Sequence, residues 1–256
     1  MVYNSEFENF LQKIDEEQYI GLGNPNAKIL FIGKEAGLGI GTNNYHGSLK
    51  SWQDKKNDYS KCPDLKDKNS KHIRNFNHTW QRYQMLYDHI LSNLNKGIAV
   101  KEDKYEINFV ENIFTTELSN LHAPNTKEAK KQEKFKSELE KRKNEYFTSE
   151  FIHKFPVTVV FASDNNYIET YPGEVCKLFN VNFDGIYNNE TTKYNTTKYK
   201  IWLHSGVYNE EYPRLLIHTR QLTRFKADEL ISDFSKIIVE FLKENSIEID
   251  TKNTTQ

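Results

Sequence analysis

A carboxylate follows the first strongly apolar run of the chain. Glu35 comes three positions after the apolar residues 29–32, and Gly33 and Gly37 flank it. Four consecutive apolar residues predict a fully buried strand of a parallel sheet. In open α/β sheets, ligands bind beyond the carboxyl ends of the strands. Glu35 is therefore a candidate functional acid, although a loop acid that caps a helix would show the same local pattern.

Two further polar groups follow apolar runs. Glu117 comes after residues 109–116, and His218 comes after residues 215–217. A carboxylate can orient or deprotonate water, and an imidazole can donate to a developing negative charge. The convergence of Glu35, Glu117 and His218 on strand ends is the strongest functional signal in the sequence. Taken alone, a histidine at a strand end is more often a structural residue.

These groups need a sheet and covering helices to bring them together. Apolar runs predict four strands, at residues 29–32, 109–116, 157–161 and 215–217. Helical patterns alternate with these strands. The first follows a capping box at Ser5 and Glu8, and the last follows Thr223, which can cap it. Between them, one helix is expected to open at Trp80, a charged one to cover 126–146, and a short one to lie near 175–179. We therefore expect a single α/β domain, a three-layer α/β/α sandwich around a central four-stranded, mostly parallel sheet.

The domain is expected to cover residues 1–245, with a flexible tail at 246–256. Residues 38–78 form a polar insertion in which eight Lys and Arg against four Asp give a net charge of +4. A connection of this length is typical of a solvated insertion or of a basic arm over a site. Residues 180–200, with alternating Tyr and Thr, predict a hairpin or excursion.

Composition limits the possible partners and cofactors. The net charge of −1 provides no global basic field, so nucleic acid would need a local patch. Cys62 and Cys176 are the only cysteines, which excludes a cysteine-ligated cluster and favours a reducing compartment. The Gly-Leu-Gly at 21–23 precedes its strand, so it does not predict a dinucleotide loop. Without an apolar leader or a long apolar stretch, we expect a soluble, cytoplasmic monomer with no membrane contact, metal or cofactor.

From about Gly21 to Leu242, the order of these pieces resembles the uracil-DNA glycosylase superfamily. The first family motif is a strand followed by Gly-Gln-Asp-Pro-Tyr or Gly-Met-Asn-Pro-Gly, and residues 33–37 (GKEAG) take its place. The last motif, His-Pro-Ser-Pro-Leu-Ser, is similar to residues 218–223 (HTRQLT) at the histidine, the leucine and the final hydroxyl. The middle strand of the family often ends in Thr-Asn before a proline-containing loop, and Thr116-Glu117 with Pro124 is similar in order.

The resemblance implies a DNA glycosylase that hydrolyses the N-glycosidic bond of a flipped-out base and leaves an abasic site, in DNA repair or in defence against foreign DNA. Glu35 would stabilise the oxocarbenium-like sugar, and His218 would donate to the leaving base. The resemblance also implies that three residues recognise the base: Gly33, Trp80 and Glu117. It implies that five residues contact single- or double-stranded DNA: Lys34, Arg220, Leu222, Thr223 and Arg224. An exposed Leu222 would be the wedge that fills the gap, although a helix-cap staple has the same pattern, and Trp80 fits a core position equally well.

The sequence departs from the family at Lys34, Ala36 and Glu117. Glu117 stands where a pyrimidine-reading Asn is expected, and an ionised Glu can only accept hydrogen bonds. Acceptance suits the N4 amino group of cytosine, so we hypothesise that the substrate carries a modified cytosine.

Two rival interpretations stay open. The departures at Ala36 and Glu117 are also compatible with an inactive module that binds DNA or a base. The near-neutral net charge is compatible with an N-glycosidase that acts on free nucleosides or nucleotides.

Overall fold

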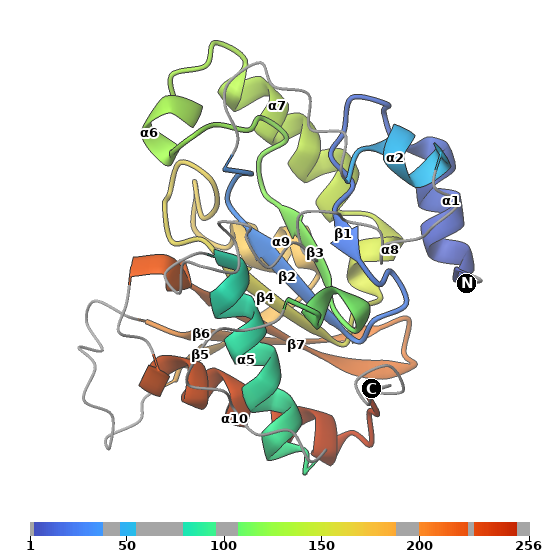
Figure 1. Cartoon of the computed structure of the whole chain (residues 1–256), viewed down its shortest axis with the longest axis vertical. Helices are drawn as coiled ribbons and strands as arrows, with labels where there is room; N and C mark the ends of the chain where they lie inside the picture. The colour runs from blue at the N-terminus through green and yellow to red at the C-terminus, as the bar shows by residue number, and fades with distance from the viewer. Residues whose placement is uncertain are drawn as a thin grey trace.

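The computed structural model describes residues 3–37, 47–54, 79–95, 107–187, 200–224 and 228–249. It forms three layers, with a mixed sheet between two layers of helices (Figure 1). This confirms the expected α/β sandwich. Most of the insertion at 38–78 lies outside the described residues, apart from the segment that contains helix α2 (Leu49–Asp54).

Within the described residues the sheet has seven strands, so the expected number of four was wrong. The strands are β1 (Leu22–Gly23), β2 (Ile29–Gly33), β3 (Phe114–Glu117), β4 (Val157–Phe161), β5 (Asn182–Ile186), β6 (Trp202–Tyr208) and β7 (Tyr212–Thr219). Their order is β1-β3-β2-β4-β7-β6-β5. The four expected strands, β3, β2, β4 and β7, are parallel neighbours. The three additional strands pair antiparallel at the edges, where short or half-exposed strands lack a continuous apolar run.

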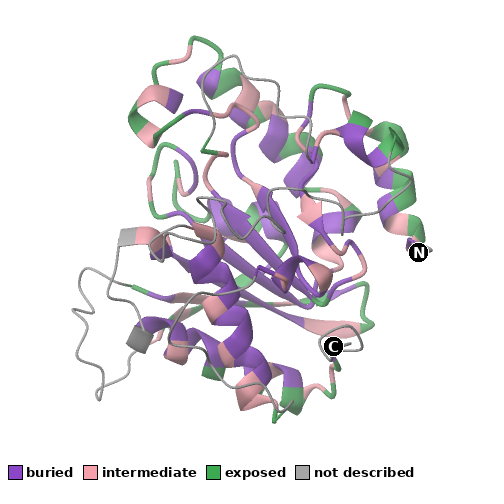
Figure 2. Ribbon diagram, in the orientation of Figure 1, coloured by how far each residue is buried: buried purple, intermediate pink, exposed green. Residues whose placement is uncertain are grey.

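Helices cover both faces of this sheet. We call the face beneath α1 (Ser5–Lys13), α7 (Phe135–Arg142), α8 (Glu150–His153) and α9 (Glu174–Phe179) the α7 face. The opposite face, which we call the α5 face, packs against α5 (Thr79–Asn93) and α10 (Asp228–Glu244). Figure 2 shows buried residues concentrated in the strands and on the inner sides of these helices. None of the helices in the described ranges is both long enough and apolar enough to cross a bilayer.

Successive residues of a strand point to opposite faces, and this alternation decides which side chains can meet. Leu30 and Ile32 of β2 belong to the core of the α7 face, whereas Ile29 and Phe31 belong to the core of the α5 face. Gly33 therefore lies on the α5 face, together with its partner Glu117. By the same alternation, His218 lies on the α7 face beside its partner Val160.

Several element boundaries differ from the sequence expectation. The first half of the expected strand 109–116 is a 3₁₀ turn (Phe109–Glu111), because Gln84 Oε1 accepts the backbone N–H groups of Asn108 and Phe109, both at 2.8 Å. The expected helix over 126–146 is divided into α6 (Thr126–Ala129), α7 and a π-helical segment (Lys143–Phe147). The first helix is capped by Asn4 rather than Ser5, with Phe7 N donating to Asn4 Oδ1 at 2.9 Å.

Two local features lie in the C-terminal part of the chain. A three-residue turn joins β6 to β7, and its Asn209 and Glu210 adopt positive φ angles of 45° and 62°. In the segment expected as a flexible tail, Ile249 is buried and Ile247 packs against the core of the α5 face. Residues 250–256 of that tail lie outside the described part of the chain.

Candidate functional site

The first candidate centre forms where β2 and β3 end side by side. Gly33 pairs with Glu117, and a Cβ atom at Gly33 would lie only 2.1 Å from Glu117 Oε2. The missing side chain at position 33 therefore provides the space that the Glu117 carboxyl occupies. Arg142 fixes the strand end: its Nε donates to the Glu117 carbonyl and its Nη2 to Thr116 Oγ1, both at 2.9 Å.

Glu117 is held in an environment that favours its protonated form. Burial of the carboxyl raises its pKa to about 8, and the neighbouring negative charge of Glu35 acts in the same direction. The positive charge of Arg142 opposes this shift without cancelling it. At neutral pH Glu117 therefore retains its proton, as one of two carboxyl groups that share a site commonly does.

Glu35 is oriented by a short chain of hydrogen bonds. Lys34 Nζ donates to Thr126 Oγ1 at 2.8 Å, and Thr126 Oγ1 donates to Glu35 Oε1 at 2.7 Å. Backbone hydrogen bonds hold the two loops together, from Ser119 N to Lys34 O at 2.8 Å and from Ala123 N to Ala36 O at 3.1 Å. Glu35 Oε1 is thus committed to the protein, and its orientation is fixed.

The other oxygen of Glu35 is buried, and the Tyr167 hydroxyl approaches the Glu35 carboxylate as a hydrogen-bond donor. Burial raises the pKa of Tyr167, and the charge of Glu35 raises it further, which places the phenol close to this carboxylate. His122 Nε2 is buried as well and has no hydrogen-bond partner among the described residues. Buried polar atoms without partners are rare, and a bound ligand or water commonly explains them.

His218 belongs to a different environment. Only 5 % of its surface is exposed, and its ring stacks on Trp202 with the centroids 4.8 Å apart. Its Nε2 lies 2.5 Å from the Ala162 carbonyl oxygen, and since a carbonyl can only accept, Nε2 carries the proton. Burial lowers the pKa of His218 to about 4, so the ring is neutral at pH 7 and Nδ1 offers only a lone pair. The N–H needed for the expected donor role is already committed to Ala162.

The structure does not bring His218 together with the carboxylate pair. His218 lines a cavity of about 520 Å³ on the α7 face, and neither Glu35 nor Glu117 contributes to its wall. The segment after β4 separates the two places, because its Tyr167 approaches Glu35 while its Ile168 lines the cavity. Of the expected site residues, the strand ends bring together Gly33, Lys34, Glu35 and Glu117, with Lys34 engaged by Thr126 rather than free for DNA.

The remaining expected residues take other positions. Leu222 is 2 % exposed within the core of the α5 face, so the expectation of an exposed wedge was wrong; the 3₁₀ turn Leu222–Arg224 directs this side chain inward. Thr223 sits in the same turn, ahead of residues 225–227 and the start of α10, and does not cap that helix. Trp80 is partly buried against Phe109, with ring centroids 5.5 Å apart, as a core residue would be. Arg220 is partly buried just after β7, and the side chain of Arg224 lies outside the described part of the chain.

Sequence reasoning missed Arg142, Thr126 and Tyr167. Arg142 lies in the charged stretch that we interpreted as solvated, yet it is fully buried. A signal was present, because Phe135, Leu139 and Tyr146 are spaced with Arg142 on one helical face. Thr126 and Tyr167 carry no such signal, since their roles depend on loops that meet only in the folded chain.

No group of three or more His, Cys, Asp or Glu side chains suited to a metal ion occurs in the ranges that the structure describes. The centre at Glu35 and Glu117 is thus built from two carboxyl groups, a lysine and hydroxyl groups, which suits proton transfer and stabilisation of positive charge. No protein-family model matches this chain, and no curated protein or solved structure is significantly similar to it.

Proposed function

We propose that this protein hydrolyses an N-glycosidic bond, as a monofunctional DNA glycosylase that removes a damaged or modified base and leaves an abasic site. The observation that carries the proposal is the Glu35–Glu117 pair, in which one proton is retained at neutral pH because the pKa of Glu117 is about 8. The parallel order β3-β2-β4-β7 supports it by placing both acids at adjacent carboxyl ends. We also propose that the protein is soluble, acts in the cytoplasm as a monomer, and serves DNA repair or defence against foreign DNA.

The reaction uses the two carboxyl groups in different protonation states. Breaking the bond leaves positive charge on the sugar and negative charge on the base. Glu35, oriented through Thr126, stabilises the sugar cation and directs a water molecule. Glu117, protonated, donates to the leaving base. This replaces His218 as the donor, because the N–H of that ring is bound to Ala162.

The protonation of Glu117 also changes the expected base preference. A protonated carboxyl carries one O–H donor and keeps an acceptor, so it can pair with the edge of either uracil or cytosine. The argument for a modified cytosine assumed an ionised Glu117, and the raised pKa removes that assumption. A modified cytosine therefore remains one candidate among amino-bearing and carbonyl-bearing bases.

The test is base excision from synthetic oligonucleotides that carry uracil, cytosine or a hypermodified cytosine, in single- and double-stranded form. Abasic sites are detected by alkaline strand cleavage. We expect excision of at least one base by the wild type and a loss of roughly a hundredfold or more for Glu35→Gln and for Glu117→Gln, because each carries out one half of the acid–base chemistry.

Glu133→Gln is the matched control, since Glu133 is exposed between α6 and α7 and should leave excision unchanged. Tight binding of oligonucleotides without cleavage would mean that the protein is a binding module rather than an enzyme. Full activity of Glu35→Gln would remove the carboxylate pair from the mechanism.

A second candidate is an N-glycosidase for free nucleosides or nucleotides. The burial of Leu222 favours it, because a free nucleoside needs no wedge to be extracted from a helix. Release of a base from nucleosides but not from oligonucleotides, with the same loss in Glu35→Gln, would establish this candidate.

A further inference from the structure

The cavity that contains His218 has a floor of aromatic rings. Phe183, Trp202, His204 and His218 come from β5, β6 and β7 and share the α7 face. The Trp202 and His218 rings are stacked with their centroids 4.8 Å apart, and the Phe183 and His204 centroids lie 5.4 Å apart. The volume of about 520 Å³ is in the range of small-molecule sites.

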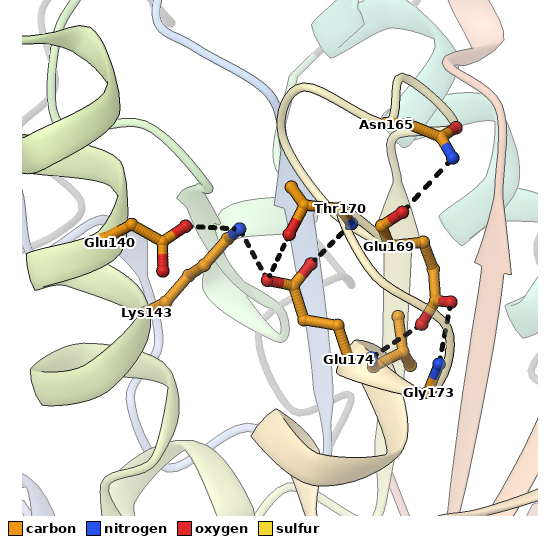
Figure 3. Close-up of polar contacts among 8 residues, drawn as sticks. Glu140, Lys143, Asn165, Glu169, Thr170, Gly173 and Glu174 are labelled. Atoms are coloured by element: carbon orange, nitrogen blue, oxygen red, sulfur yellow. Dashed lines mark hydrogen bonds and ion pairs between the residues drawn. The ribbon is translucent and has the colours of Figure 1, made fainter.

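The wall of this cavity is anchored by two acids (Figure 3). Glu169 accepts from Val175 N at 2.7 Å and from Gly173 N at 3.2 Å. Glu174 accepts from the backbone N of Thr170 at 3.0 Å and from Lys143 Nζ at 2.7 Å. The segment that covers the ring floor is therefore preformed. Both oxygens of Glu169 already accept backbone N–H groups within it, so a cationic ligand would have to share them.

One polar atom in the cavity is unsatisfied. His218 is 5 % exposed and lines the cavity, and its Nδ1 makes no hydrogen bond within the described ranges, because the Ala162 carbonyl bonds only Nε2. A buried ring nitrogen without a partner carries a desolvation penalty, and a ligand that supplies the missing hydrogen bond would relieve it. Burial lowers the pKa of both His204 and His218, so neither imidazole offers a positive charge to an anion at neutral pH.

We propose that this cavity is a second binding site, which takes an uncharged planar nitrogen heterocycle. The ligand stacks on the rings of the floor, and its edge donates a hydrogen bond to His218 Nδ1. The site is independent of the carboxylate pair, so the proposal stands or falls separately from glycosidic hydrolysis. Adenine is a suitable probe, because it is neutral, planar and carries both donors and acceptors at its edge.

The first measurement is titration calorimetry of the full chain with adenine, with the planar ions benzoate and benzamidine as charged comparisons. We expect adenine to bind and both ions to bind at least tenfold more weakly. His218→Phe keeps a ring on the floor but removes the nitrogen, and it should weaken adenine binding at least tenfold. Ser205→Ala is the matched control, since Ser205 is the exposed neighbour of His204 that points away from the floor and bonds Asp184.

A second readout does not depend on any variant. Cys176 lines the same cavity, so bound adenine should slow its alkylation by iodoacetamide in the wild-type protein, measured by mass spectrometry of the peptide. If His218→Phe does not fold, Trp202→Leu, which removes a ring of the floor, should weaken adenine binding instead, and the protection of Cys176 is measured on the wild type. Absence of adenine binding, equal binding of the charged rings, or binding without protection of Cys176 would each overturn the proposal.

Discussion

At the scale of single residues, surroundings rather than residue type determine the chemistry. The sequence identified Glu35 and Glu117 as a pair of acids at strand ends, and these ends are neighbours. It did not give the protonation state of Glu117, because that depends on burial and on a charge distant along the chain. The same limit applies to His218, whose type suggested a donor but whose N–H is bound to a carbonyl.

The raised pKa of Glu117 predicts a pH dependence of stability. The pKa is about 8 in the folded protein against an ordinary value of 4.5, so between these values the folded state binds one more proton than the unfolded chain. The free energy of unfolding should then fall as pH rises through this window, by up to about 1.4 kcal/mol per pH unit for this group. Urea unfolding of the wild type and Glu117→Gln at pH 6.5, 7.2 and 8 should show this slope only in the wild type. The same change of unfolding free energy with pH in both proteins would contradict this prediction.

A methyl group at position 33 should disturb the same carboxyl. In Gly33→Ala the new Cβ would lie 2.1 Å from Glu117 Oε2, so the side chain must move or the strands must separate. We expect the free energy of unfolding to fall by roughly 1–3 kcal/mol, the usual effect of overpacking, and excision to fall with it. Gly37→Ala is the control, because a Cβ there meets no atom within 4 Å. An equal effect of the two substitutions would argue against the close contact.

At the scale of elements, continuous apolar runs were good predictors and mixed patterns were not. Strand β4 matches its expected range, since all five of its residues are buried. Strand β5 lies within the hairpin or excursion expected at 180–200, whereas β6 begins beyond that range and was missed, because its residues mix exposed and buried positions. The charged segment after Thr126 was interpreted as solvated, although Arg142 and Lys143 are almost fully buried. Counting charges hid a periodic apolar face that carries both groups inward.

Lys143 should therefore matter much more than the lysine two positions before it. Its ammonium lies 2.7 Å from Glu174, and both side chains are almost fully buried. Lys143→Met leaves the buried carboxylate of Glu174 without its partner, and we expect a loss of about 3–5 kcal/mol in the free energy of unfolding. Lys141→Met removes only a solvent-exposed pair with Asp15, and it should change little. Urea unfolding compares the two, and similar midpoints would contradict the structural role of Lys143.

At the scale of the whole molecule, the order of the strands explains why the expected site is divided. Strand β4 lies between β2 and β7, and His218 points to the face opposite that of Glu117. Neither strand order nor facing can be obtained from four apolar runs, because both depend on how distant segments pair. The three-layer class could be predicted, since alternating strands and helices leave few other ways to bury apolar surface on both sides of a sheet.

The C-terminal end of the described chain contributes to the core of the α5 face. Ile249 is 5 % exposed and belongs to the same cluster as α5 and α10. Ile249→Ala should lower the free energy of unfolding by about 2–4 kcal/mol, the usual range for a buried truncation of this kind. Ile186→Ala, at a position that is 48 % exposed, is the control and should have a much smaller effect in thermal or urea unfolding. A stability of Ile249→Ala equal to that of the control would mean that the tail contributes nothing.

The turn at Asn209 and Glu210 has a consequence for the opposite end of the molecule. Side chains alternate along β7 with a period of two, so adding or removing one residue in this turn would slide the strand by one step against β6. Ile217 or Thr219 would then face the cavity in place of His218, and the imidazole would be turned toward α10. Two residues in the left-handed conformation thus help to set which side chains of β7 face the cavity, without lining it themselves.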